Sequence, residues 1–141
     1  MEFAPPVLVG VRSMCTQEHD FLSQADVPLF TAKEFLDDER SLDRIVHALS
    51  RHVYLSLDLD VFDPSQMPSV GTPEPGGLNW HDVLRILRRV ATQKKIIAAD
   101  FVELSPIPGL VAPDFLAAKL VYTTVGYVLF PHKLEKNTPS A

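Results

Sequence analysis

The stretch from Val53 to Leu78 most constrains the fold, because it passes from an apolar strand into a cluster of carboxylates and then into a loop rich in proline and glycine. The β-forming residues at 53–57 read as a continuous run, which predicts a parallel strand covered on both faces. Asp58 and Asp60 follow at the carboxyl end of that strand. Ligands of open α/β sheets bind beyond the carboxyl ends of the strands, so the stretch predicts a binding site there.

Asp58 and Asp60 are two residues apart, so the two-residue period of a strand would point both carboxylates the same way. Two neighbouring carboxylates repel each other and are costly to desolvate, which makes a divalent metal ion their natural ligand. Alternatively, both aspartates end the strand and accept hydrogen bonds from the backbone, while Asp63 and Pro64 turn the chain. The spacing alone leaves both hypotheses open.

The rest of the chain alternates short apolar segments with amphipathic ones. Further strands are predicted at 7–12, 28–30 and 96–104, and helices at 16–25, from the capping box at 31–34, at 41–51, after the cap Asn79, and at 113–130. This order predicts right-handed βαβ units and a parallel sheet. The last helix is expected to be buried, because Pro113 and charged residues interrupt its apolar run too often for a membrane span.

Length and composition exclude several classes of protein. The 141 residues suit one domain, which we place at 1–130, followed by a polar tail at 131–141. The net charge of −5 is mixed in sign along the chain, without a basic block for nucleic acid and without a signal peptide. Cys15, the only cysteine, excludes an internal disulfide and a cysteine-based zinc motif, and is expected to be a half-buried small hydrophobe. These features favour a cytoplasmic protein.

Two longer segments resemble the ureohydrolase family, which includes arginase and agmatinase. The first joins DLDVFDP at 58–64 to GTPEPGGL at 71–78, and the second is ADFVELSP at 99–106. The sequence AAKLVY at 117–122 is similar to the last helix of agmatinase-type members. Ser69 and Val70 depart from the Gly-Thr pair usual in the family. Matches of this length and order are far more specific than one Asp-x-Asp spacing.

The resemblance implies a three-layer α/β/α sandwich with a mainly parallel sheet, the arginase-like fold, and a binuclear Mn²⁺ site at the strand ends. It implies that Asp58 bridges both metals, that Asp60 completes the second, and that a metal-bound hydroxide attacks the guanidinium carbon. It also implies that Glu103 holds the substrate guanidinium, with Thr72 nearby. Paired N–H bonds from a planar guanidinium to a carboxylate are sound chemistry, although a glutamate at a strand end could also simply be solvated. Asp63 is expected to fix the turn.

The resemblance corresponds only to the C-terminal half of a usual member. The family's GGDH and DAHxD elements, which hold the remaining metal ligands, are absent from this sequence. The histidines have no setting typical of metal ligands; they are His19, His47, His52, His81 and His132. Two carboxylates fall short of the about five or six ligands of Mn²⁺. We therefore expect no complete catalytic site in this chain, and no or little activity from the chain alone.

Three functional hypotheses follow. In the first, the chain is part of a manganese-dependent ureohydrolase, most consistent with hydrolysis of agmatine to putrescine and urea, with arginine or guanidinobutyrate as alternative substrates. Its open sheet edge and apolar surface would then bind a missing N-terminal half or further copies of the chain. In the second, it is a non-catalytic assembly or interaction domain of the same fold. In the third, it is an unrelated α/β domain that uses Asp58 and Asp60 for Mg²⁺ or phosphate, which the motif length disfavours.

Overall fold

The computed structural model describes residues 4–131, so the predicted tail lies outside the described residues except for its first position. Within these residues, four strands form two separate parallel pairs. β1 (Leu8–Val11) pairs with β2 (Leu29–Thr31), and β3 (His52–Asp58) pairs with β4 (Lys95–Val102). The predicted strands and their parallel pairing are confirmed. The single sheet expected from the sequence is instead divided in two over this part of the chain.

The helices follow the predicted order. They are α1 (Thr16–Gln24), α2 (Ala32–Asp37), α3 (Ser41–Ala48), α4 (Trp80–Gln93) and α5 (Val111–Leu129), with a single 3₁₀ turn, η1 (Leu59–Val61), directly after β3. The predicted capping box at Thr31 starts α2, and the predicted cap Asn79 starts α4, where it also forms a capping box with Asp82. α5 begins two residues before the predicted Pro113, because proline is tolerated in the first turn of a helix.

Cys15 differs from its prediction. It is exposed, and its sulfur accepts a 3.5 Å hydrogen bond from the backbone N–H of Glu18 at the start of α1. The Glu18 carboxylate in turn accepts from the Cys15 backbone N–H at 2.7 Å. Cys15 is therefore the N-cap of α1, and the expected half-buried position is wrong.

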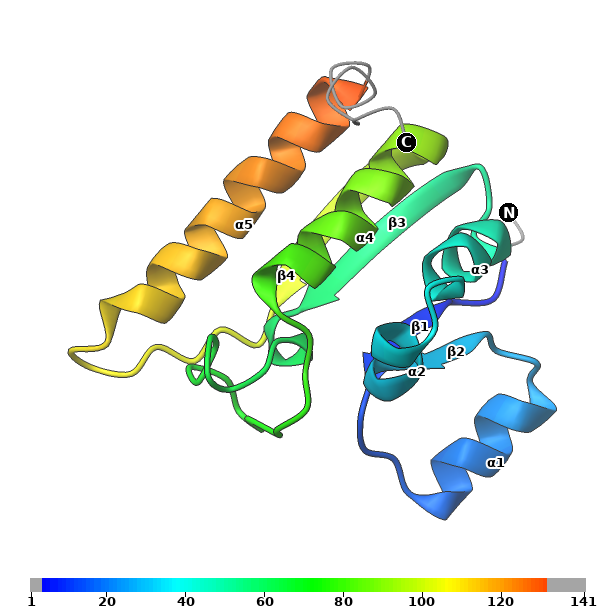
Figure 1. Cartoon of the computed structure of the whole chain (residues 1–141), viewed down its shortest axis with the longest axis horizontal. Coiled ribbons are helices and arrows are strands. Elements are labelled where there is room, and N and C mark those ends of the chain that lie inside the picture. The colour runs from blue at the N-terminus through cyan, green and yellow to red at the C-terminus, as the bar shows by residue number, and fades with distance from the viewer. Residues whose placement is uncertain (1–3, 132–141) are drawn as a thin grey trace.

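One face of the β3–β4 pair is covered by α4 and α5, which run side by side in front of it (Figure 1). The buried side chains on α4 are spaced by three or four residues, as on one face of a helix; they are Val83, Leu87, Val90 and Ala91. Val83 and Leu87 join the core that also contains Leu57 of β3 and Leu120 of α5, whereas Val90 packs in a second cluster with Val46 and Val53. This packing fixes the strand ends that carry the candidate site.

The other face of the β3–β4 pair is open over the described residues. Along β3, Val53 and Leu57 are buried, whereas Tyr54 between them is 62% exposed. The Tyr54 and Ser56 hydroxyls both donate hydrogen bonds to the Asp100 carboxylate of β4 on this open face. The expectation that β3 is covered on both faces is therefore wrong for this part of the chain, and the strand alternates in the way of a half-covered sheet.

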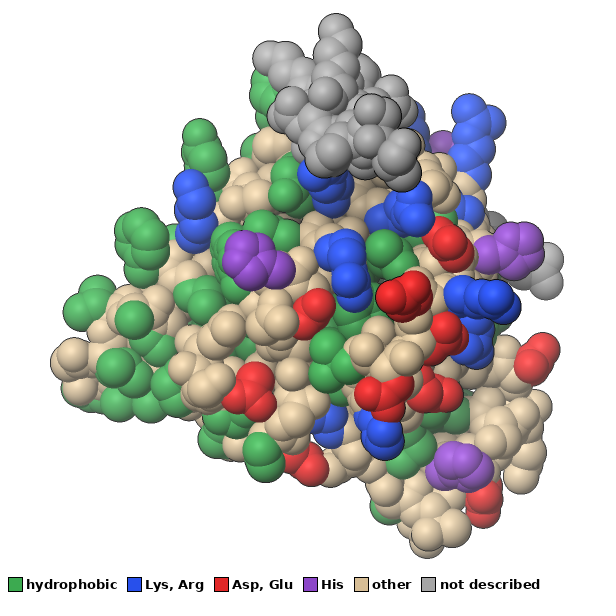
Figure 2. Space-filling model, viewed as in Figure 1, with side chains coloured by type: hydrophobic (Ala, Val, Ile, Leu, Met, Phe, Trp, Pro, Cys, Tyr) green, Lys and Arg blue, Asp and Glu red, His purple; other side chains and the backbone are tan. Residues whose placement is uncertain are grey.

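α5 is only partly buried. Its inward residues include Ala117 and Leu120, but Phe115 is 71% exposed and Tyr122 is 73% exposed. Hydrophobic side chains consequently gather on the surface over α5 (Figure 2). The expectation of a buried last helix is therefore wrong for the side of α5 that carries Phe115 and Tyr122. Within residues 4–131, no helix combines the length and the apolar character needed to cross a membrane.

Candidate functional site

The candidate site begins where β3 ends. Asp58 is the last residue of β3, and its carboxylate accepts a 3.0 Å hydrogen bond from the backbone N–H of Asp60. This bond caps η1, so Asp60 lies in a helical turn rather than in a continued strand. The strand geometry predicted for the two aspartates is therefore wrong. Asp58 accepts a backbone hydrogen bond, as the turn-forming alternative predicted.

The loop after η1 brings Thr72 to this turn. The Thr72 hydroxyl donates a 3.3 Å hydrogen bond to the Asp60 carboxylate. Both residues keep contact with solvent, because Asp60 is half-buried and Thr72 is exposed. Two of the residues that the sequence singled out are thus in direct contact.

Glu103 directly follows the end of β4 and lies near the loop that carries Thr72. Its backbone has a φ of +68°, in the left-handed region that non-glycine residues rarely adopt. The Ser105 backbone N–H donates a 2.8 Å hydrogen bond to the Ser69 carbonyl and so joins the two loops. Oε2 of Glu103 lies 3.5 Å from the position that a Cβ on Gly71 would occupy. The structure therefore places Glu103 beside the loop that carries Thr72.

Electrostatics link these carboxylates. Partial burial is the main factor that raises the pKa of Asp58 above its usual range, and the negative charges of Asp60 and Glu103 raise it further. The hydrogen bond from the Asp60 backbone and the positive charge of Arg12 lower it, but by less. Three carboxylates therefore lie close enough for the charges of two to affect the third, with one guanidinium beside them.

The described residues do not complete a metal site. Over residues 4–131, the His, Cys, Asp and Glu side chains form no group of three or more that could hold a metal ion. Mn²⁺ in an oxygen site takes about six donors, so Asp58 and Asp60 do not fit a binuclear centre by themselves. The four described histidines are all exposed; they are His19, His47, His52 and His81. His132 lies outside the described residues.

Asp63 and the glycines after it shape the loop. The Asp63 carboxylate accepts hydrogen bonds from the Ser65 hydroxyl at 2.6 Å and from the backbone N–H groups of Ser65 and Gly76 at 3.0 Å each. A Cβ on Gly77 would lie 2.5 Å from the backbone nitrogen of Asp63. The prediction that Asp63 fixes the turn is confirmed, and Gly77 is needed because two backbone segments nearly touch.

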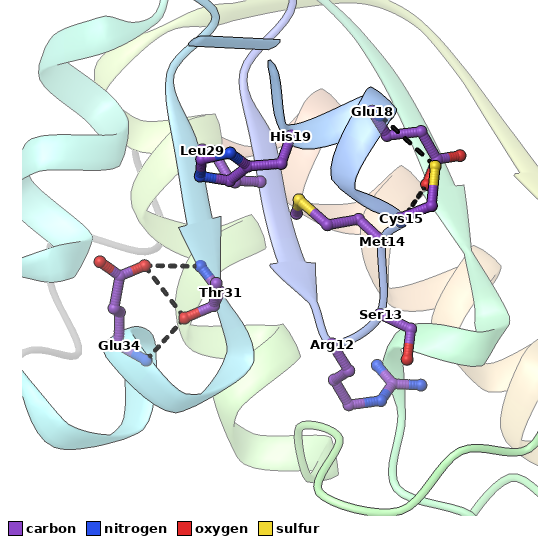
Figure 3. A pocket seen from close by; sticks show the side chains of 9 residues that line it. All are labelled: Arg12, Ser13, Met14, Cys15, Glu18, His19, Leu29, Thr31 and Glu34. Carbon is purple, nitrogen blue, oxygen red and sulfur yellow. Dashed lines mark hydrogen bonds between the residues drawn. The ribbon is translucent and has the colours of Figure 1, made fainter. Parts of the chain in front are cut away.

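Sequence reasoning missed Arg12, which lies just beyond the end of β1 (Figure 3). Its guanidinium donates hydrogen bonds to the backbone carbonyls of Gly10, at 3.2 Å, and Asp60, at 2.5 Å. It also borders an open pocket at the carboxyl ends of β1 and β2, which is lined by Arg12, Ser13, Met14, Cys15, Glu18, His19, Leu29, Thr31 and Glu34. Arg12 could have been found from the sequence, because it ends a predicted parallel strand and the carboxyl ends of parallel strands lie at the same edge of a sheet.

Known proteins resemble the chain in sequence and in structure. The chain is 38% identical over 124 residues to N(1)-aminopropylagmatine ureohydrolase of Synechocystis sp., and 43% identical over 122 residues to the protein of that name from Thermus thermophilus. These alignments cover 87% and 86% of this chain but only 40% and 41% of the relatives. The chain therefore spans about two fifths of the length of these curated relatives.

Solved structures of ureohydrolases also resemble the chain in fold. Agmatine ureohydrolase of Thermoplasma volcanium matches with a TM-score of 0.75 and 30% identity, over 89% of this chain and 42% of that one. Arginase from Bacillus caldovelox matches with a TM-score of 0.74 and 32% identity, over 88% and 42%. The predicted arginase-like fold is confirmed. Because the family model described as Arginase family also matches residues 4–126, which is most of the sequence, the chain belongs to the arginase family.

Proposed function

We propose that this chain supplies part of the active site of an enzyme that hydrolyses a guanidino compound and releases urea. The observation that carries the proposal is the contact between Thr72 and Asp60 beyond the end of β3, with Glu103 at the end of β4 beside the loop that carries Thr72. These residues come from three separate segments and leave their polar groups accessible to a ligand. Such convergence at strand ends is the usual position of a ligand site in an α/β fold.

Glu103 is the proposed contact for the guanidinium of the substrate. Its carboxylate can accept two parallel N–H bonds from a planar guanidinium, which gives both charge neutralisation and orientation. Its backbone stays in the left-handed region although this conformation costs free energy for a residue with a Cβ. Conformations of this kind concentrate at functional sites, which supports a role beyond solvation at a strand end.

The proposed substrate is agmatine, which would yield putrescine and urea for polyamine biosynthesis. Similar proteins carry the names agmatinase and N(1)-aminopropylagmatine ureohydrolase, so agmatine with an added aminopropyl group is an equal candidate. Arginine and guanidinobutyrate remain alternatives, because proteins named arginase also match the chain. All these molecules present the same guanidinium group to Glu103.

We propose that Mn²⁺ binds at Asp58 and Asp60 only when further ligands join them. The raised pKa of Asp58 supports this, because a carboxylate that is partly buried and lies near the charges of Asp60 and Glu103 is stabilised by a neighbouring cation. The further ligands would come with a polypeptide equivalent to the three fifths of the relatives that this chain does not cover. The chain alone is accordingly proposed to be inactive.

The open face of the β3–β4 pair and the exposed side of α5 are the proposed surfaces for that association. Tyr54 on the sheet and Phe115 on the helix are both mostly exposed, and large exposed apolar surfaces commonly mark interfaces. The same surfaces support a second candidate function, a non-catalytic assembly domain that pairs with itself. The family match argues against the third hypothesis of an unrelated Mg²⁺ or phosphate domain.

Urea release tests the proposal. The chain would be assayed with Mn²⁺ and agmatine, aminopropylagmatine, arginine or guanidinobutyrate, alone and mixed with the part of the Thermus thermophilus relative that it does not cover. We expect urea only from the mixture, and loss of that activity with Asp58→Asn. A folded complex that releases no urea from any of the four substrates would instead support the assembly domain.

A further inference from the structure

We infer that Arg12 is a positioning residue that holds the turn carrying Asp60 from the neighbouring pair of strands. The expected effect of Arg12 on catalysis rests on the proposed function, whereas its contacts with the turn do not. The Arg12 guanidinium donates from Nη1 to the Gly10 carbonyl of β1 and from Nη2 to the Asp60 carbonyl of η1, which is 48 residues away in sequence. It therefore links two sheets that share no strand pairing.

Two neighbours of Arg12 strengthen this link. Gly10 lies so close to the turn that a Cβ there would come within 2.4 Å of Cγ2 of Val61. On the other side, the Ser13 hydroxyl donates a 2.5 Å hydrogen bond to the Glu74 carboxylate in the loop that carries Thr72. The end of β1 thus contacts both segments that form the Asp60–Thr72 pair.

The guanidinium is suited to this task in a way that other cations are not. Its planar fork presents separate N–H groups to the two carbonyls, whereas an ammonium is a compact point charge on a flexible stem. Nε of Arg12 is buried and lacks a hydrogen-bond acceptor among the described residues, a cost that the other two bonds must offset. Stability alone is thus a poor reason for arginine at this position.

Fixing the Asp60 carbonyl fixes the orientation of the peptide that carries the Asp60 side chain. The side chain in turn meets the Thr72 hydroxyl at 3.3 Å, which is near the limit of a hydrogen bond. Functional groups must be held to within about 0.5 Å of their productive geometry. Loss of the Arg12 bond should therefore loosen the turn and separate Asp60 from its proposed partners, without removing any group that would touch substrate.

Amide hydrogen exchange of this chain, resolved to the residues of η1, tests the inference. In Arg12→Met we expect the N–H groups of Asp60 and Phe62 to exchange at least about tenfold faster, because the turn opens locally. Exchange in α4 should stay within about twofold of the wild type, because Arg12 bonds only to the carbonyls of Gly10 and Asp60 and touches none of the hydrogen bonds inside this helix. Arg51→Met, which removes the same charge from an exposed position, should change neither.

Unchanged exchange at η1 would overturn the inference, and so would a uniform increase across the chain, which indicates an ordinary loss of stability. If Arg12→Met does not fold, Arg12→Lys decides the question. A local increase at η1 in the lysine variant supports a need for the fork, and wild-type exchange there refutes it. None of these measurements requires metal or substrate.

The catalytic part is tested in the mixture used for urea release. Arg12→Lys should lower kcat about tenfold or more while KM for agmatine stays within about twofold, because position is lost rather than substrate contact. An equal kcat would overturn the catalytic part of the inference. Absence of urea with the wild-type chain would refute the proposed function, while hydrogen exchange would still decide whether Arg12 positions the turn.

Discussion

The Asp63 carboxylate accepts a 3.0 Å hydrogen bond from the backbone N–H of Gly76, thirteen residues further along the chain. This bond closes the loop that carries Thr72, and the loop then leads directly into α4. The site is therefore formed by a loop that is tied at its base and anchored to a helix with a buried face. Asp63 itself supports the loop through its bonds to Ser65 and Gly76.

The pH dependence of stability should report on Asp63. Hydrogen bonds from the Ser65 hydroxyl, the Ser65 backbone and the Gly76 backbone lower the pKa of Asp63. A carboxyl group with a lowered pKa in the folded state stabilises the fold above its unfolded pKa, and this contribution is lost as pH falls through the folded pKa. Asp63→Asn should therefore be less stable than the wild type at pH 7, with a difference that shrinks on acidification. Urea denaturation at a series of values between about pH 3 and pH 7 measures this difference in stability.

The matched control for Asp63 is Asp20→Asn, which alters an exposed carboxylate on α1. This variant should follow the wild type at every pH. A deficit of Asp63→Asn that stays constant with pH would contradict the assignment, because the loss would then be independent of the charge.

Two glycine-to-alanine substitutions should have opposite effects. Gly10 has a φ of +85°, and its new Cβ would lie 2.4 Å from Val61. Gly10→Ala should cost about 1–3 kcal/mol of unfolding free energy, through overpacking and an unfavourable φ. Gly126 lies within α5 with open space around it, so Gly126→Ala should stabilise by about 0.5–1 kcal/mol. Thermal or urea unfolding compares the two, and equal effects would show that the β1–η1 contact is looser than described.

The buried and exposed sides of α5 should respond differently to the same substitution. Leu120 is 0% exposed within the core, so Leu120→Ala should destabilise the chain by about 2–5 kcal/mol. Leu129 on the same helix is 61% exposed, and Leu129→Ala should change stability by less than about 0.5 kcal/mol. Denaturant unfolding at low protein concentration measures both. A large loss for Leu129→Ala would mean that a second molecule covers this side of α5.

Glu103→Gln should weaken the proposed guanidinium contact. The amide keeps one acceptor oxygen but loses the charge, and hydrogen bonds to charged groups contribute about 1.5–3 kcal/mol each. We expect kcat/KM for agmatine to fall about 10- to 100-fold in the urea-release mixture, since each 1.4 kcal/mol is a factor of about ten. Glu39→Gln, at an exposed position before α3, is the control and should leave activity unchanged. Full activity of Glu103→Gln would exclude Glu103 as the guanidinium contact.

Local chemistry explains which parts of the fold the sequence predicted correctly. The starts of α2 and α4 were predictable because Thr31 and Asn79 cap residues only two or three positions away. Asp63 was assigned to the turn for the same reason, although one of its hydrogen bonds comes from Gly76, thirteen residues further along the chain. Thr72 and Glu103 were singled out through the family resemblance. Their spacing in the sequence could not show that Thr72 bonds to Asp60 or that Glu103 lies beside the Thr72 loop.

The sequence by itself determined the elements, their order, the parallel pairing and the family, because hydrophobic period, caps and motifs are properties of short segments. The tertiary structure alone decided that Tyr54 and Phe115 face outward, that Glu103 lies beside the loop carrying Thr72, and that Arg12 reaches the Asp60 carbonyl. Each of these depends on which surfaces meet across many residues. An apolar strand or helix has the same sequence pattern whether one of its faces or both are covered.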